Sequence, residues 1–496
     1  MERTLIRDIV AQEGKEVLLK GWADTRRDHG KLVFIDLRDR SGTAQIVFTA
    51  NVAGADAGET GGNIRSEDVI EVRGTVKQRP KGMVNEKLPH HLGHYEIQAT
   101  SFAFINRATD KGLPIPIDGD GYDIGEEVRM EYRYVDLRRV RLQKNLKNRA
   151  QIVKFIRDFL SARDFVEVET PILSKSTPEG ARDYLVPSRL APGNFYALPQ
   201  SPQQYKQLLM VAGLERYFQI ARCFRDEDTR GDRQPEFTQL DLEMSFVTQE
   251  DIVRITEELF TSLVRELYPE KKIPSLPFPR LTHAEAMKKY RSDKPDLRKK
   301  PEDPNELAFV WITDFPMFEK KDDGSLGAVH HPFTLPTTDT SADPVRFQHE
   351  SYPEYRTLMK ALDSEQSSLT LKAYQYDLVL NGFEIGGGSI RTYDKKLLAK
   401  VFERLGNNPK TIEAQFGHLL KAFDYGVPPH GGIAPGIDRF VMVMENEPNI
   451  REVIAFPKTG DGRDLMMHAP SEVAKEQLNE LGLELAKKKT KKRNGK

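Results

Sequence analysis

A strand-like segment over residues 236–246 places hydrophilic side chains where a dry core cannot accept them. In its sequence, EFTQLDLEMSF, polar residues alternate with apolar ones at the two-residue period of a β-strand. They are Glu236, Thr238 or Gln239, Asp241 and Glu243. Carboxylates buried without partners are costly, so a strand with such an inner face lines a cavity. The alternative is a charged hairpin on the surface. The segment favours a fold built around a polar cavity.

The composition is that of a folded, multidomain chain. It has 496 residues, 38% of them hydrophobic, with 25 Phe and 16 Tyr, which excludes a disordered protein and suggests about three domains. Lys and Arg together number 74 against 75 Asp and Glu, so the overall charge predicts no polyanionic partner. Any nucleic-acid surface must therefore be a local patch.

The sequence also indicates a compartment. Cys223 is the single cysteine, which excludes an internal disulfide framework and a multi-thiolate zinc site and fits a reducing cytosol. No run of about 18 apolar residues occurs, and the first residues, MERTLIRDIVAQEGKEV, lack an apolar secretory core. We expect a soluble, cytoplasmic protein with no membrane segment.

The first hundred residues predict a small β-barrel. Short β-rich runs at residues 17–23, 31–38, 44–48, 69–74 and 94–97 are separated by Gly-, Asp- and Ser-containing turns. Five such strands favour an OB-like barrel, the type that binds nucleic acids, although a small β-domain without a ligand has the same pattern.

Beyond the barrel, the pattern changes from strands to helices and then to both. Residues 106–127 are rich in Pro and Gly and form the best linker candidate. Apolar residues at helical spacing follow over 128–163 and predict long amphipathic helices. Strands and helices alternate to about Val453. Residues 481–496 form a basic tail, and its like-charged run over 487–493 predicts a solvated, disordered end.

Two arginine-bearing segments predict a site for a phosphorylated ligand. Arg225 closes one predicted strand, and the polar strand returns after a loop with more arginines, which forms a plausible hairpin clamp. Arg439 opens an apolar helical run after several glycines, and a helix N-terminus favours an anion. Two arginines that converge on a triphosphate are consistent with this pattern.

A third segment, over residues 377–391, combines carboxylates, glycines and an arginine. Asp377 and Glu384 are hard oxygen ligands suited to Mg²⁺ held between phosphates. Three glycines allow a ligand to approach the backbone, and Arg391 supplies a fork for a carboxylate. No Gly-x₄-Gly-Lys-[Ser/Thr] motif occurs, which argues against a P-loop ATPase.

These segments resemble the signature motifs of class II aminoacyl-tRNA synthetases. Residues 165–171 (FVEVETP) are similar to motif 1, Arg225 with the following hairpin to motif 2, and residues 432–439 to motif 3. Within this class the chain is similar to bacterial-type aspartyl-tRNA synthetases of subclass IIb. The strings that carry the similarity are STPEGARDY at 176, QSPQQYK at 200, RQPEFTQ at 233 and HHPFT at 330.

The resemblance implies a multidomain α/β fold and a reaction. An OB-fold anticodon-binding domain would cover residues 1–105, a hinge 106–127, and a class II catalytic domain, an antiparallel sheet flanked by helices, residues 128–480. The extra domain that bacterial members carry is expected to be absent near 298–308, where only a short stretch occurs. The family adenylates L-aspartate with ATP and Mg²⁺, transfers it to tRNA, and forms homodimers.

The resemblance also assigns site residues. Arg225 and Arg439 would be the catalytic arginines on the α- and γ-phosphates. Positions matching the aspartate pocket are Glu179, Ser201, Gln203, Gln204, Tyr205, Lys206, Arg225, Gln239, Asp241, His330 and Arg391, with Lys206 and Arg391 as the side-chain carboxylate clamp and Asp241 suited to the ammonium. Positions matching the ATP site are Arg225, Asp226, Glu227, Gln234, Glu384, Gly436, Ile437, Asp438 and Arg439, and the Mg²⁺ ligands would be Asp377 and Glu384.

In the barrel, the resemblance assigns anticodon contacts to Phe34, Gln45 and Glu96, although Phe34 could equally be a core residue. Members that charge both tRNA(Asp) and tRNA(Asn) tend to have a His and a Gly at the positions of His29 and Gly82. Gly82 has no side chain that could clash with the wrong base, and His29 offers a donor or an acceptor. We therefore expect a non-discriminating enzyme, although both could simply be turn residues.

Three alternatives stay open. The first is an enzyme strictly specific for tRNA(Asp). The second is a tRNA-independent paralogue ligase, which the N-terminal barrel disfavours. The third is a non-catalytic RNA-binding relative, which the presence of Arg225, Glu384 and Arg439 together disfavours.

Overall fold

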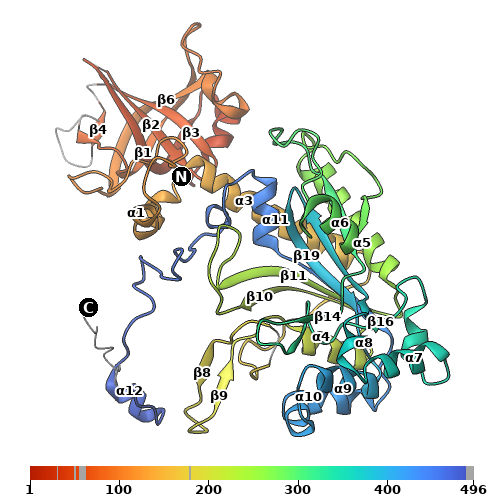
Figure 1. Cartoon of the computed structure of the whole chain (residues 1–496). Coiled ribbons are helices and arrows are strands. Elements are labelled where there is room, and N and C mark those ends of the chain that lie inside the picture. Colours follow the sequence, from red (N-terminus) through yellow and green to blue (C-terminus); the bar gives the residue numbers. More distant parts are fainter. Residues whose placement is uncertain (31, 50–51, 55–62, 178–179, 487–496) are drawn as a thin grey trace, which may run out of the picture. The chain divides into compact units, whose positions relative to one another are not determined.

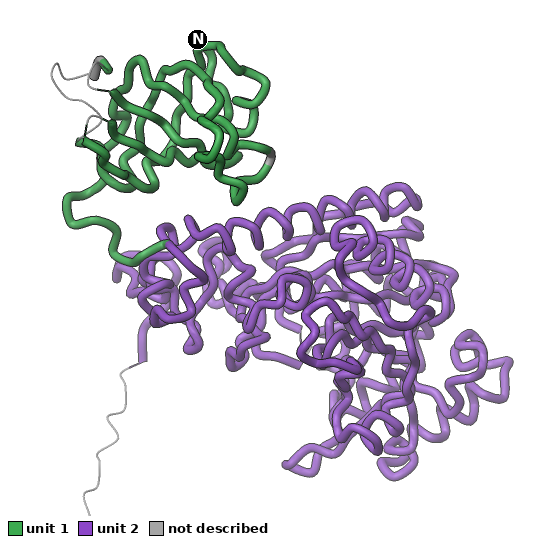
Figure 2. Tube along the Cα trace, turned by 90° about the horizontal axis from the view of Figure 1, so that it is seen from above, with its two compact units in different colours: residues 1–117 green, residues 118–496 purple. Residues whose placement is uncertain are grey.

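The computed structural model describes residues 1–30, 32–49, 52–54, 63–177 and 180–486. The chain divides into two compact units, Met1–Ile117 and Asp118–Lys496 (Figure 2). The division falls inside the predicted linker, whose first residues follow the last strand of the barrel and whose last residues belong to the second unit. Within the described ranges, no helix is long and apolar enough to cross a membrane.

The first unit is a closed β-barrel, as the strand pattern predicts. Strand β1 (Glu16–His29) pairs with β2 (Leu32–Asp39) and β5 (Val69–Gln78), β2 pairs with β3 (Gly42–Thr49), and β5 pairs with β6 (Tyr95–Asn106). A parallel pairing of β3 with β6 closes the ring. The short strand β4 (Ala53–Gly54) and the 3₁₀ turns η1 (Ile6–Gln12) and η3 (Pro89–His94) complete the unit.

Strand β2 shows how alternation fixes the faces of the barrel. Val33, Ile35 and Leu37 are buried in the core, whereas Phe34 and Asp36 between them are half-buried on the outer face. Phe34 is therefore not a core residue, a point that the sequence pattern leaves open because apolar residues flank it on both sides.

The second unit is built on an eight-stranded sheet (Figure 1) with the order β12-β13-β18-β19-β20-β11-β10-β7. From β13 to β10 all neighbours are antiparallel, and parallel pairs form both ends, so the sheet is mixed. The strand bounds are β7 Val166–Glu167, β10 Arg216–Phe224, β11 Glu236–Ser245, β12 Arg280–Thr282, β13 Phe309–Thr313, β18 Gln375–Leu380, β19 Phe383–Ile390 and β20 His430–Pro435.

Helices supply the apolar surface that the sheet needs. Helices α3 (Val140–Ser161), α5 (Gln249–Leu267) and α11 (Ile437–Met444) share one large core with strands β11, β13, β18 and β20. Helix α4 (Gln203–Val211) packs on β10 and β11, and α9 (Lys395–Arg404) and α10 (Pro409–Phe423) bury a second cluster around Phe333. The predicted sheet flanked by helices is confirmed.

The predicted helices over 128–163 are interrupted. Helices α1 (Glu126–Glu131) and α2 (Arg133–Asp136) are short, and only α3 is long. Tyr132 and Arg139 leave the helical conformation, and Arg129, Arg133 and Arg139 then all donate to Asp136. Apolar spacing does not report this break, at which charged side chains gather around Asp136.

Smaller elements complete the second unit. They are β8 Leu185–Pro187, β9 Phe195–Ala197, α6 His283–Tyr290, β14 Phe318–Lys320, β15 Leu326–Ala328, β16 Pro336–Thr337, η4 Pro344–Phe347, α7 Pro353–Ala361, α8 Glu365–Ser368, β17 Lys372–Ala373, η5 Ile450–Glu452 and α12 Lys475–Glu480. Helix α12 precedes the basic run, and residues 487–493 lie outside the described ranges.

The contact between β20 and β11 gives the first testable prediction. A Cβ on Gly432 would overlap the Leu242 carbonyl oxygen and the Glu243 carboxylate, and the backbone of two paired strands cannot yield as a side chain can. We expect Gly432→Ala to destabilise the protein by about 1–3 kcal/mol, the usual range for overpacking. Thermal melting would measure this. The control is Gly460→Ala, where no described atom lies within 4 Å of the new Cβ, and equal shifts for both variants would contradict the prediction.

Candidate active site

A cavity of about 580 Å³ lies over strands β11, β19 and β20 and the start of α11. The polar strand lines it, with part of the predicted set of residues. Phe237, Gln239 and Asp241 border the cavity. Glu236 instead pairs with Arg222 near the surface, and the Thr238 amide donates to Asp438. The predicted Gln239 and Asp241 thus share the cavity face with Phe237 at the two-residue period of a strand, whereas Glu236 and Thr238 do not line the cavity.

Four buried charges form the floor of one end of this cavity. The Lys206 ammonium lies 3.0 Å from the Asp241 carboxylate and 3.2 Å from that of Glu243. Arg391 donates to both oxygens of Glu243, at 2.9 and 3.0 Å. All four side chains are at most 2% exposed, so each charge depends on its partners.

The pKa values of the two carboxyls in this cluster are shifted in opposite directions. Burial alone would raise the pKa of Glu243, but Arg391 and Lys206 outweigh it and lower that pKa to about 2. Burial raises the pKa of Asp241 above its ordinary value, and Lys206 opposes this only in part. Glu243 is thus firmly ionised, whereas the charge of Asp241 is only partly compensated by Lys206.

Asp241 also has an unused oxygen. Its Oδ1 is buried and receives no hydrogen bond from any described residue, and the same holds for Oε1 of Gln375, which also lines the cavity. Unpaired buried acceptors are rare in native proteins, and a bound donor is one reason for their presence. The Asp241 side of the cavity therefore fits a cationic ligand group.

Two histidines buttress this floor in different ways. The Nη1 of Arg391 donates to His331 Nε2 at 2.9 Å, which assigns a neutral ring to His331. Burial and then the charge of Arg391 lower the pKa of His331 well below its ordinary value, in agreement with this role. His330 lies 3.2 Å from Asp377 through Nε2. His331 is a site residue that the sequence analysis did not assign, and Glu243 was placed on the polar face of its strand without a role.

The other end of the cavity carries arginines. The Arg225 guanidinium lies 5.1 Å from the centre of the Phe237 ring and forms no ion pair with a described residue, so it is free for an anion. Arg439 lies 3.2 Å from Asp232 and donates to the Glu384 carbonyl oxygen. Its Nε is buried without an acceptor among the described residues. This end fits phosphates.

A space bordered by two carboxylates lies above Gly387. A Cβ placed there would be 3.0 Å from Asp377 Oδ1 and 3.8 Å from Glu384 Oε1, so both oxygens face the same point. Asp377 already accepts hydrogen bonds from Gln375 and His330, and Glu384 pairs with Lys294 at 3.0 Å. No cluster of three potential metal ligands exists within the described ranges. Two hard oxygens fit a Mg²⁺ ion whose other ligands are phosphates and water.

Most of the predicted site residues converge on this cavity. Those that line it are Ser201, Gln203, Lys206, Arg225, Glu227, Gln234, Gln239, Asp241, His330, Glu384, Arg391, Gly436, Asp438 and Arg439. Gln234 uses its amide on the Lys458 backbone, and Asp438 pairs with Arg149, so these two shape the wall.

Five predicted residues lie elsewhere. Gln204 and Tyr205 line a separate cavity of about 230 Å³, because each step along α4 turns a side chain away from the face of Gln203 and Lys206. Asp226 borders a third cavity beside Tyr184. Ile437 is buried in the core. Asp377 is not itself a lining residue, but it lies 3.2 Å from His330 and beside Gly387, which are. Glu179 lies outside the described residues.

The predicted anticodon residues share the outer face of the barrel. Gln45 donates to Glu96 at 3.1 Å, and Arg27 bridges Gln45 and Asp36. Phe34 lies on the same face of β2 as Asp36. The His29 ring meets Phe34 edge to face, at 5.5 Å between ring centres. Gly82 has φ of +92° and open space around it.

Comparisons with known proteins agree with this architecture. Residues 125–460 match the family model for class II tRNA synthetases (D, K and N), and residues 17–105 match that for the OB-fold nucleic acid binding domain. The aspartate--tRNA(Asp/Asn) ligase of Moorella thermoacetica is 42% identical over 604 residues, covering 97% of this chain and 96% of that protein. The aspartate--tRNA ligase of Lysinibacillus sphaericus is 40% identical, with 95% and 96% covered.

Solved structures share the fold. The asparaginyl-tRNA synthetase of Pyrococcus horikoshii, complexed with asparaginyl-adenylate, superposes with a TM-score of 0.70 at 22% identity, covering 92% of this chain and 98% of that one. The aspartyl-tRNA synthetase of Entamoeba histolytica gives 0.66 at 22% identity, with 92% and 91% covered.

An OB barrel followed by a mixed sheet, whose cavity has arginines at one end and a buried four-charge cluster at the other, is the architecture of a class II aminoacyl-tRNA synthetase. The chain belongs to the class II tRNA synthetases of the D, K and N group, which confirms the resemblance seen in the sequence.

Proposed function

We propose that the protein ligates L-aspartate to tRNA through aspartyl-adenylate. The observation that carries this proposal is the four-charge floor. Lys206 and Arg391 can share a side-chain carboxylate, and the free Oδ1 of Asp241 can accept from an α-ammonium. Arg225, which has no ion pair among the described residues, is left for the α-carboxylate and the α-phosphate. The relatives named aspartate--tRNA(Asp/Asn) ligases support the same substrate.

The chain acts by positioning in this scheme. An oxygen of the aspartate α-carboxylate attacks the α-phosphorus of ATP and pyrophosphate leaves. A hydroxyl of the terminal tRNA ribose then attacks the acyl carbon and AMP leaves. Arg225 and Arg439 stabilise the charge on the phosphates, and no side chain has to act as a nucleophile. Glu384 and Asp377 would hold Mg²⁺, which would neutralise phosphate charge.

The same floor explains selection against asparagine. A neutral amide would offer Lys206 and Arg391 no substrate carboxylate to share, and a site built to pair with a substrate group rejects an analogue that lacks it by about 10⁴-fold. A lysine side chain would bring a third cation to the two already present.

The barrel carries the residues on which we base the proposed set of tRNA substrates. We assign anticodon binding to the outer face with Phe34, Gln45 and Glu96, where an aromatic ring can stack on a base and the amide and carboxylate can read its edge. Gly82 and His29 impose no single base, so we propose charging of both tRNA(Asp) and tRNA(Asn). Strict tRNA(Asp) specificity is the alternative, and one relative is named simply an aspartate--tRNA ligase.

Two features support a homodimer. Strand β7 is one of the two edge strands of the sheet, and among the described residues it pairs with β10 at Tyr217 and Phe218. Val166 of β7 and the nearby Ile172 and Leu173 are 40–53% exposed, an apolar edge that suits a two-fold partner. We place the enzyme in the cytoplasm, where tRNA is charged and the one cysteine stays reduced.

Aspartate-dependent exchange of pyrophosphate into ATP, measured with and without tRNA, tests the proposal as a whole. Exchange without tRNA, followed by charging of tRNA, is the expected result. Exchange without any charging would favour the paralogue ligase, and absence of both would favour the non-catalytic RNA-binding relative.

The clamp gives the second prediction. Arg391→Leu should reduce kcat/KM for aspartate at least about thirtyfold, equivalent to about 2 kcal/mol, because the substrate carboxylate and Glu243 both lose a charged partner. The KM for ATP should change much less. Arg280→Leu is the control, since Arg280 also forms a two-bond pair, with Glu250, away from the cavity. An unchanged kcat/KM for aspartate in Arg391→Leu would disprove the assignment.

The third prediction concerns discrimination between tRNAs. Charging of tRNA(Asp) and tRNA(Asn) under identical conditions should give kcat/KM values within a hundredfold, a gap of about 2.7 kcal/mol. A single base contact contributes about 1–3 kcal/mol, so one discriminating residue could exceed this limit. A larger preference for tRNA(Asp) would establish the strictly specific alternative.

The fourth prediction tests the dimer. Sedimentation at micromolar concentration should give the mass of two chains, and Leu173→Glu should raise the dissociation constant at least about tenfold, because a carboxylate would enter an apolar contact. Leu485→Glu, at a residue 77% exposed near the end of the described chain, is the control. A wild-type mass of one chain would exclude the dimer.

A further inference from the structure

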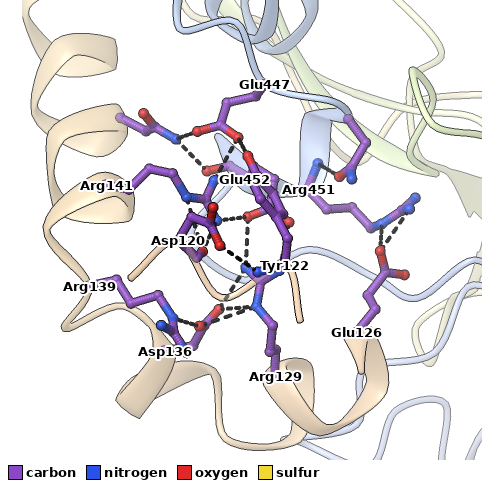
Figure 3. Close-up of polar contacts among 12 residues, drawn as sticks. Asp120, Tyr122, Glu126, Arg129, Asp136, Arg139, Arg141, Glu447, Arg451 and Glu452 are labelled. Carbon is purple, nitrogen blue, oxygen red and sulfur yellow. Dashed lines mark hydrogen bonds and ion pairs between the residues drawn. The ribbon is translucent and has the colours of Figure 1, made fainter. Parts of the chain in front are cut away.

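Residues 449–452, the turn that follows α11, contact two segments far apart in the sequence. One is the start of the second unit, from Asp118 through helix α1, which continues from the linker. The other is the tip of the β10–β11 loop, residues 230–233, which borders the nucleotide end of the cavity. Figure 3 shows the first of these contacts.

Buried charged side chains hold residues 449–452 against the segments that follow the linker. Glu452, 4% exposed, accepts from Arg129 at 2.7 and 3.1 Å and from Arg141 at 2.8 Å. Arg141 also donates to Glu447 and to the Asp120 carbonyl oxygen. Figure 3 shows these side chains meeting between α3 and the turn. Removing one member of such a group leaves a buried charge unpaired, which makes this side rigid.

The same turn holds the loop tip. The Ile450 amide donates to the Gly231 carbonyl oxygen at 2.9 Å, and Ile450 itself lines the cavity. Nη1 of Arg451 lies 3.4 Å from the Arg230 carbonyl oxygen. Asp232, next in the loop, pairs with Arg439. The loop tip therefore contacts Arg439, which the proposed function assigns to ATP.

Arg451 joins the two sides through one side chain. Its guanidinium binds Glu126 of α1 with Nε and Nη2, both at 2.9 Å, and directs Nη1 to the loop. The Arg451 side chain is 14% exposed, whereas Glu126 is 39% exposed. Arg451 does not line the cavity, so it does not touch a ligand there.

We infer that Arg451, held by Glu126, is a positioning residue that sets the β10–β11 loop for ATP. The aspartate floor depends on α4, β11 and Arg391, none of which Arg451 contacts, so the effect is confined to the nucleotide end. This inference rests on the proposed function only in taking ATP as the ligand of that end.

The test is a comparison of substrates in Arg451→Met. Without tRNA, pyrophosphate exchange should show a KM for ATP raised about tenfold or more, with the KM for aspartate within about twofold of wild type. Glu126→Gln should raise the KM for ATP in the same direction. The double variant should be no worse than Arg451→Met alone, because both changes break one interaction.

The matched control is Arg463→Met. Arg463 pairs with Glu127, the neighbour of Glu126, at 3.1 Å on the surface, but makes no contact with the loop tip among the interactions of the described residues. It should leave both KM values unchanged. Thermal melting of each variant separates a folding defect from a change in position, and Glu126→Gln, at a partly exposed site, provides a folded variant if Arg451→Met does not fold.

Direct titration with ATP separates the two proposals. If wild type binds ATP but shows no aspartate-dependent exchange, the proposed function fails, while the ratio of ATP dissociation constants between wild type and variants still decides the role of Arg451. The inference is overturned if Arg451→Met and Glu126→Gln leave ATP binding within about twofold, or raise the KM for aspartate as much as that for ATP.

Discussion

The buried cluster of Lys206, Asp241, Glu243 and Arg391 is the interaction on which the site depends. Four charges removed from water are stable only when each has a partner in good geometry. The cluster therefore fixes the relative positions of α4, which carries Lys206, of β11, which carries both carboxylates, and of Arg391 at the end of β19. Within this cluster, Oδ1 of Asp241 receives no hydrogen bond from a described residue, so it is available to a ligand.

A second group of buried charges, around Glu452 and Asp136, holds elements together away from the cavity. Burial alone would raise the pKa values of both carboxyls, but the surrounding arginines lower them. Carboxyls with lowered folded-state pKa values stabilise the protein above their ordinary pKa, and that contribution is lost as the pH falls through the folded value. At neutral pH this group therefore stays charged and keeps the turn at residues 449–452 in place.

A close backbone contact between strands β19 and β20 positions the start of helix α11. Gly386 faces Pro435, and a Cβ on Gly386 would lie 2.8 Å from the Cα of Pro435, so the proline at the end of β20 is accommodated by a residue without a side chain. The Gly436 amide still donates to the Ile385 carbonyl oxygen, at 2.7 Å, just before α11 begins. The helix that carries Arg439 therefore begins from a backbone fixed by the sheet.

The sequence by itself determined the barrel strands, the polar strand and the arginines at their ends, because alternation and turn residues act over a few neighbours. Motif strings also identified Lys206, Arg225, Arg391 and Arg439, which the structure brings to one cavity. Tertiary structure alone decided which polar residues of β11 face that cavity, that Phe34 points outward, and that Gln204 and Asp226 border other spaces. It also decided the pairing of Arg391 with Glu243, 148 positions apart. Local periodicity depends only on neighbours in the sequence. Contacts such as this one form because a buried charge without a partner is costly, however far away in the sequence the partner lies.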